Sequence, residues 1–139
     1  DADYIRDLFA ARAAIEPAAV RWGELADAPS LVTLTSSAFD YAARGEHNEV
    51  SSINQQFHRK LVASLGSPTL NEQMDNLLAR MRLTFLLAIP RYPQLHADHI
   101  QGNITLATLI ADGKRLEAAT LSHDSLMNTC EKILAVLDD

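Results

Sequence analysis

The sequence contains little cysteine, glycine, proline or aromatic residue, and its basic residues are outnumbered by acidic ones. A single cysteine, Cys130, among 139 residues excludes an internal disulfide and a zinc site built from several cysteines. With 12 basic and 18 acidic residues the net charge is −6, which argues against a nucleic-acid clamp because phosphate contacts need clustered lysine and arginine. No apolar run approaches the roughly 20 residues of a membrane span, and no signal sequence opens the chain. These absences favour a cytoplasmic protein whose present segment binds neither membrane nor DNA.

What the sequence has in abundance is alanine and leucine at helical spacing. Hydrophobic residues make up 47% of the chain, which is enough to form one core at this length. Apolar residues recur at three- and four-residue steps, and few glycines or prolines interrupt them. This periodicity predicts helices over about 3–26 (bent near Pro17), 31–43, 50–66, 68–88, 97–111 and 114–137. About six helices with short connections predict one all-α domain, residues 1–139, built as an antiparallel bundle.

Asn54 and His58 are the first candidates for a binding site. They are four residues apart in a predicted helix, so both project from one face. An amide oxygen and an imidazole nitrogen at this spacing can coordinate a metal or hold a polar molecule, although an exposed pair without function has the same spacing. His58 lies beside the apolar stripe of Phe57 and Leu61, so it needs a hydrogen-bond partner. His123 also lies close to an apolar stripe, where a core histidine bonded to a backbone carbonyl is the alternative.

Several segments together carry a family pattern. They are residues 12–19 (RAAIEPAA), 54–61 (NQQFHRKL) and 67–70 (SPTL), and Asp112 followed by His123. The pattern resembles the FCD domain, the C-terminal effector-binding domain of FadR-type members of the GntR family of bacterial transcription regulators, in which residues 54–61 correspond to D-x-x-F-H-x-x-L. The resemblance implies an all-helical bundle around a polar cavity and a homodimer. It also implies that DNA is bound only through an N-terminal winged helix-turn-helix domain, which this chain does not contain.

The resemblance also implies a metal site, because many family members hold zinc or nickel with one aspartate and three histidines. Carried over to this sequence, the aspartate falls on Asn54, the first histidine on His58 and the last on His123. The middle histidine falls on Gln101, and His99, two positions earlier, should face away from it on a helix. Carboxamide oxygens are poorer ligands than carboxylate or imidazole. We therefore expect a degenerate site, with Gln101 or His99 as its fourth position, whose side chains converge on one cavity and bind divalent metal weakly or not at all.

Arg12, Arg80 and Arg82 are the candidates for binding an anionic effector. A guanidinium binds a carboxylate through two parallel hydrogen bonds, and the family resemblance implies that small organic acids are sensed. Each arginine could instead lie on a solvated helix face, and Arg12 could pair with Glu16 one turn along its own helix.

The leading functional hypothesis is a regulatory domain that binds a small, anionic organic metabolite, without catalysis and without a required cofactor. The first alternative is a metal-dependent or histidine-based enzyme. Against it, no serine or cysteine nucleophile has a base at motif spacing, and there is no glycine-rich phosphate loop. The second alternative is a plain helical interaction module, which a cavity filled by apolar side chains would favour. Under the leading hypothesis, Tyr92 and His96 are candidates for lining an entrance.

Overall fold

Helices account for nearly all of the computed structural model, which describes residues 1–137. No strand occurs within that range, so the all-α prediction is confirmed. The elements are, in chain order, α1 (Ala2–Trp22), α2 (Ala28–Ser36), α3 (Ala38–Ala43), α4 (His47–Ala63), α5 (Pro68–Ala88), the short 3-10 helix η1 (Ile89–Arg91), α6 (Leu95–Ala111) and α7 (Arg115–Leu137). Ser67 caps α5, because its hydroxyl oxygen accepts the N–H of Leu70 at 3.2 Å.

The helix predicted over residues 31–43 is divided at Ser37 into α2 and α3. The Ser37 hydroxyl donates to the carbonyl oxygen of Leu34 at 2.7 Å. A serine side chain that binds a neighbouring backbone group competes with the regular helical ladder. The prediction of a single helix here was therefore wrong because it rested on apolar periodicity alone.

The first helix also ends earlier than predicted, at Trp22, although it continues through Pro17. Arg115, at the start of α7, donates from Nε to the carbonyl of Val20 at 2.5 Å and from Nη2 to the carbonyl of Gly23 at 2.7 Å. These bonds satisfy carbonyl groups that the end of a helix leaves without partners. A side chain distant in sequence thus helps to set where α1 stops.

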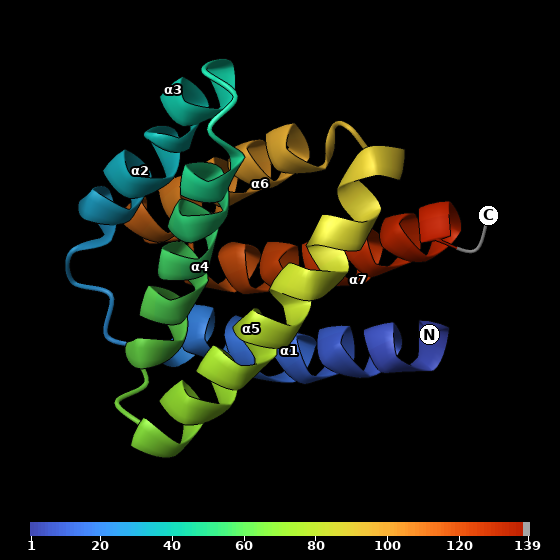
Figure 1. Cartoon of the computed structure of the whole chain (residues 1–139). Coiled ribbons are helices and arrows are strands. Elements are labelled where there is room, and N and C mark those ends of the chain that lie inside the picture. The colour runs from blue at the N-terminus through green and yellow to red at the C-terminus, as the bar shows by residue number, and fades with distance from the viewer. Residues whose placement is uncertain (138–139) are drawn as a thin grey trace.

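The helices form a bundle in which α1 and α7 lie side by side and run in opposite directions, while α5 crosses them (Figure 1). Helix α6 packs against α2 and α7, and α4 packs against α1 and α5. One apolar cluster joins α1, α5 and α7 and includes Leu8, Phe9, Met81, Leu126 and Ile133. A second joins α1, α2, α4, α6 and α7 and includes Val20, Leu31, Phe57, Leu106 and Ala118. Among residues 1–137, no helix is long and apolar enough to cross a membrane.

Gly23 allows the end of α1 to pack against the end of α4. A Cβ atom at this position would lie 1.8 Å from Ser64 Oγ and 2.6 Å from the carbonyl oxygen of Ala19. The adjacent Glu24 N–H donates to the Ser64 carbonyl at 2.9 Å, so the two segments cannot separate freely. We expect Gly23→Ala to lower the free energy of unfolding by about 2 kcal/mol, because an added methyl group forces packed atoms apart.

Gly102→Ala is the matched control for this substitution, since nothing lies within 4 Å of a Cβ atom there. Alanine inside a helix is favoured over glycine, so this variant should be more stable by roughly 0.5 kcal/mol. Urea denaturation of both variants measures the difference. Equal stability of the two variants would contradict the close approach of α1 and α4.

Candidate functional site

A cavity of about 160 Å³ lies among the helices, between the two apolar clusters. An engineered protein cavity of about 150 Å³ holds benzene, so this space suits a molecule of about six non-hydrogen atoms. Many of the lining side chains are polar, and they come from α1 (Arg12 and Glu16), α4 (Asn54 and His58), α6 (Asp98, His99 and Asn103) and α7 (Ser122, Ser125, Asn128, Thr129 and Lys132). The structure thus places a pocket with several polar lining side chains among the helices, and this pocket opens to solvent beside the exposed Asp98 and Lys132.

A buried ion pair with a histidine forms one part of the wall. Arg12 Nε donates to Glu16 Oε2 at 2.5 Å, and Arg12 Nη2 donates to Glu16 Oε1 at 3.3 Å. His58 Nδ1 lies 2.6 Å from Glu16 Oε1, and the Glu16 side chain is only 1% exposed. Burial alone would raise the pKa of Glu16, but Arg12 and His58 lower it to about 2. Glu16 is therefore an ionised acceptor at neutral pH.

The ionised Glu16 determines how His58 presents its ring. A carboxylate can only accept hydrogen bonds, so the proton on the Glu16 side of the ring belongs to His58 Nδ1. The other ring nitrogen, Nε2, has no hydrogen-bond partner in residues 1–137 and belongs to a side chain that lines the cavity. The sequence predicts that His58 needs a hydrogen-bond partner, and Glu16 is that partner. The ion pair between Arg12 and Glu16, which the sequence offers as an alternative for Arg12, is also present.

Helix α6 contributes His99 and Asn103 to the wall. Asn103 Nδ2 donates to Asn54 Oδ1 at 2.7 Å, which links α6 to α4. The His99 ring meets Phe85 edge to face with 4.9 Å between ring centres. Burial, with smaller effects from His58, Arg12 and His96, lowers the pKa of His99 to about 3. The His99 imidazole is therefore neutral at physiological pH and can both donate and accept.

The expectation that Gln101 reaches the cavity is wrong. Gln101 is exposed, and its amide nitrogen donates to the hydroxyl of Thr105 at 3.4 Å on the outer side of α6. Residues two apart on a helix point about 200° apart, so His99 and Gln101 cannot face the same cavity. The structure selects His99, because α6 presents positions 99, 103 and 106 inward.

The expectation that His123 reaches the cavity is also wrong, because its position on the helix turns it outward. His123 is exposed, and its Nδ1 lies 3.1 Å from Asp124 Oδ1. Neighbouring helical residues point about 100° apart, and it is Ser122 that lies on the buried side of α7. Ser122 continues the stripe of Ala118 and Leu126, and a lone hydroxyl in an apolar stripe was the signal that could have found it.

Of the three arginines predicted to bind an anion, only Arg12 lines the cavity. Arg80 donates from Nε to the Tyr4 hydroxyl at 3.0 Å and stacks on the Tyr4 ring. Arg82 lines a separate, smaller pocket beside α5. Neither Arg80 nor Arg82 lines the space that Arg12 lines, and the pocket of Arg82 adjoins that space through Asn54 and Phe85.

Tyr92 and Asp98 form a hydrogen-bonded pair among the residues that line the cavity. Burial, together with Asp98, raises the pKa of Tyr92 to about 12, so the phenol keeps its proton and donates to the carboxylate. Helix α7 contributes a further charged side chain, Lys132, to this lining. The expected place of Tyr92 beside the cavity thus agrees with the structure, whereas His96 lines a different space that is described below.

The donors do not fit the four-ligand metal set that the resemblance implies. Among residues 1–137, no group of three or more histidine, cysteine, aspartate or glutamate side chains is placed to hold a metal ion. Asn54 Oδ1 already accepts a bond from Asn103, and His58 Nδ1 is bound to Glu16. What remains is His58 Nε2 and His99, which is a smaller and less charged set than zinc or nickel sites use.

The buried carboxylate predicts a stability change at acid pH. The folded-state pKa of Glu16 is depressed from 4.5 to about 2, so its stabilising effect is complete above pH 4.5 and is lost as pH falls towards 2. We expect wild-type protein to lose about 3 kcal/mol of unfolding free energy from this group across that range. Glu16→Gln should be less stable at pH 7 by about 3 kcal/mol, since it leaves Arg12 buried without an anion, and should lack this part of the pH dependence.

Denaturation at a series of pH values measures both effects. Glu46→Gln is the control, because its ion pair with Arg44 is exposed on both sides and should leave stability and pH dependence almost unchanged. If Glu16→Gln and wild-type protein showed the same slope below pH 4.5, the assignment of an ionised Glu16 would be wrong.

Of the comparisons with known proteins, the one with protein families gave a match. A family model described as the FCD domain matches residues 7–127, which is most of the chain. Neither the comparison with curated proteins nor that with solved structures gave a significant match. The match runs from within α1 to the middle of α7 and includes most of the cavity-lining residues, but not Asn128, Thr129 or Lys132. The chain therefore belongs to the FCD family, the C-terminal effector-binding domains of GntR-family regulators.

Proposed function

We propose that this domain senses a small organic metabolite, which binds in the cavity of about 160 Å³ and changes how a dimeric cytoplasmic regulator holds its DNA operator. The observation that carries the proposal is a cavity with a polar wall inside an FCD domain. Arg12, Glu16 and Ser122 are buried in this lining, and buried polar side chains are costly unless they find partners, so their grouping around one space favours a polar ligand. This arrangement also argues against a plain interaction module, for which an apolar filling was expected.

The free hydrogen-bond donors of Arg12 and Lys132 support an anionic effector that also carries hydroxyl or amide groups, although Glu16 and Asp98 balance the charge of the lining. Arg12 has five N–H donors, and Glu16 accepts from only two of its nitrogens. Its remaining donors, together with Lys132, suit a carboxylate. Ser122 and Asn103 add groups that both donate and accept hydrogen bonds, which suits a neutral polar substituent.

We infer that effector binding needs no metal in this chain. Asn54 and Asn103 are bonded to each other, and the nearby imidazoles are better placed to bond an organic molecule directly. A catalytic role is less well supported than binding. Glu16 orients His58 as it would a general base, but no hydrogen bond among residues 1–137 joins His58 to Ser122 or Ser125. Without a nucleophile paired to that base, the arrangement offers binding rather than covalent chemistry.

A thermal-shift panel of short hydroxy acids, dicarboxylic acids, amino acids and neutral polyols tests the proposal. An effector that binds only the folded state raises the melting temperature in proportion to the logarithm of its concentration. We expect an acid of about six non-hydrogen atoms to do so. Asn103→Leu should weaken that binding about tenfold or more, because it leaves polar groups of the ligand without partners.

Gln101→Leu is the matched control on the same helix, since its side chain is exposed on the outer face of α6. This variant should bind the acid as wild-type protein does. Weaker binding by Gln101→Leu with normal binding by Asn103→Leu would show that the cavity described here is not the effector site.

The proposed dimer has a candidate surface on α5. Leu83, Leu86 and Leu87 are 66%, 54% and 69% exposed and lie at three- and four-residue spacing on this helix. Exposed apolar side chains grouped on one face are typical of a surface that another protein covers. A second copy of the chain is the partner that the family implies.

We expect the double variant Leu83→Glu with Leu87→Glu to be monomeric at micromolar concentrations at which wild-type protein sediments as a dimer, because the interface would bury unpaired charges. Leu116→Glu is the control, as Leu116 is 68% exposed but lies on α7. It should remain dimeric. A monomeric wild-type protein, or a dimeric double variant, would contradict this surface.

A further inference from the structure

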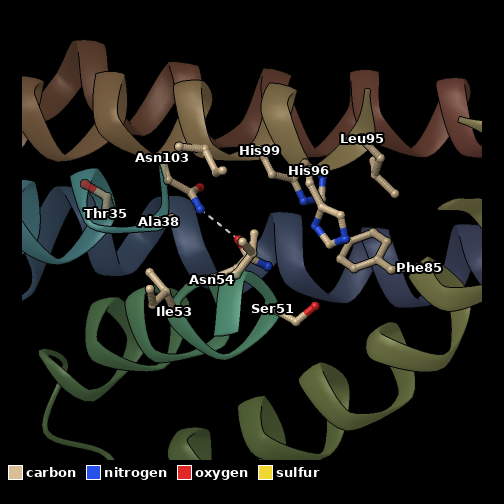
Figure 2. Close-up of a pocket in the computed structure, with 12 residues that line it drawn as sticks. Thr35, Ala38, Ser51, Ile53, Asn54, Phe85, Leu95, His96, His99 and Asn103 are labelled. Carbon is tan, nitrogen blue, oxygen red and sulfur yellow. Dashed lines mark hydrogen bonds between the residues drawn. The ribbon is translucent and has the colours of Figure 1, made fainter. Parts of the chain in front are cut away.

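A second, smaller chamber of about 20 Å³ adjoins the large cavity. The two spaces share Asn54, Phe85, His99 and Asn103, which together form the wall between them. Figure 2 shows the Asn54–Asn103 hydrogen bond from α4 to α6, with Phe85 and His99 farther along the same wall. The wall thus consists of two bonded amides and of two rings in edge-to-face contact.

One side chain that lines the chamber has a buried nitrogen atom that lacks a protein partner. His96 lies on α6, and its Nε2 atom is buried with no hydrogen-bond partner among residues 1–137. Its ring stacks on His47, with 5.2 Å between ring centres and 16° between planes, which fixes the ring's position. A buried polar atom without a partner lowers stability, so this one indicates that something else binds it.

The lining shows what kind of group fits. Its polar members are Thr35, Ser51, Asn54, His96, His99 and Asn103. No aspartate, glutamate, lysine or arginine lines the chamber, so neither a cation nor an anion would find an opposite charge there. Burial, and then His47, lowers the pKa of His96, which favours its neutral ring. A space of this size accommodates about one water molecule, which needs two to four polar partners.

We propose that this chamber is a hydrogen-bonding subsite that holds one water molecule, bound by His96 Nε2 and by side chains of the wall that separates it from the large cavity. Water suits the site because it can donate to Nε2 or accept from it, whichever tautomer His96 adopts. The water also connects His96 with the amides of Asn54 and Asn103, which are the groups that an effector meets from the other side.

This inference rests on the proposed function only in calling the larger space the effector site, and the chamber can be tested without any effector. A crystal structure of the whole chain without added ligand should show one density peak about 2.7–3.2 Å from His96 Nε2. An empty chamber, or a His96 ring turned so that Nε2 meets a protein atom, would overturn the proposal. Failure to find an effector would contradict the proposed function but leave this result unchanged.

A pair of variants gives a second, independent measurement. His96→Phe keeps an aromatic ring for the stack on His47 but removes Nε2. If the nitrogen binds water, this variant should melt about 3 °C lower, because the water loses a partner and the other polar groups are less well satisfied. If the nitrogen has no partner at all, removing it should instead raise the melting temperature, which would overturn the proposal.

His47→Phe is the matched control, because it replaces the other ring of the same stack and His47 does not line the chamber. Its melting temperature should stay within about 1 °C of the wild-type value. If His47→Phe lowered the melting temperature as much as His96→Phe, the lost stability would come from the stacked rings. The conclusion that His96 Nε2 binds water would then be overturned.

Discussion

The arrangement of the cavity depends on the Glu16 carboxylate. A carboxylate that is 1% exposed must be paired, and Glu16 is paired twice, with Arg12 on its own helix and with His58 on α4. One anion therefore keeps a guanidinium within the wall, fixes the proton on His58 and ties α1 to α4. Without Glu16, Arg12 would be an uncompensated buried charge, and no partner would fix the proton on His58 Nδ1. The positions of both side chains in the wall would then no longer be fixed.

Around that group, other side chains of the lining bond one another in pairs. The Asn54–Asn103 bond joins α4 to α6, and Tyr92 donates to Asp98. Each pair uses only part of the hydrogen-bonding capacity of its members, so donors and acceptors remain for a ligand. The Asn54–Asn103 pair keeps polar atoms partly buried between helices, while the two apolar clusters supply most of the burial.

Much of the fold could be predicted from the sequence, because apolar periodicity and caps such as Ser67 are local properties. The Arg12–Glu16 pair could also be predicted, because its members are four residues apart on one helix. The contact of His58 with Glu16 joins residues 42 positions apart, and no local pattern specifies it. The inward faces of α6 and α7 were misassigned because a shift of one or two residues turns a helix by 100° or 200°. Gln101 and His123 matched a family pattern, but packing placed His99 and Ser122 inward instead.

Gly102 gives the cavity an adjustable dimension. It lines the space from α6, and a Cβ atom there would meet nothing within 4 Å. Its backbone is helical without a positive φ, so any ordinary side chain is compatible with it. Because Gly102 is itself exposed, a side chain there would extend the rim of the lining without displacing packed atoms. Under the proposed function, a larger residue at this position would change the outline of the pocket and leave the polar side chains of its wall unchanged.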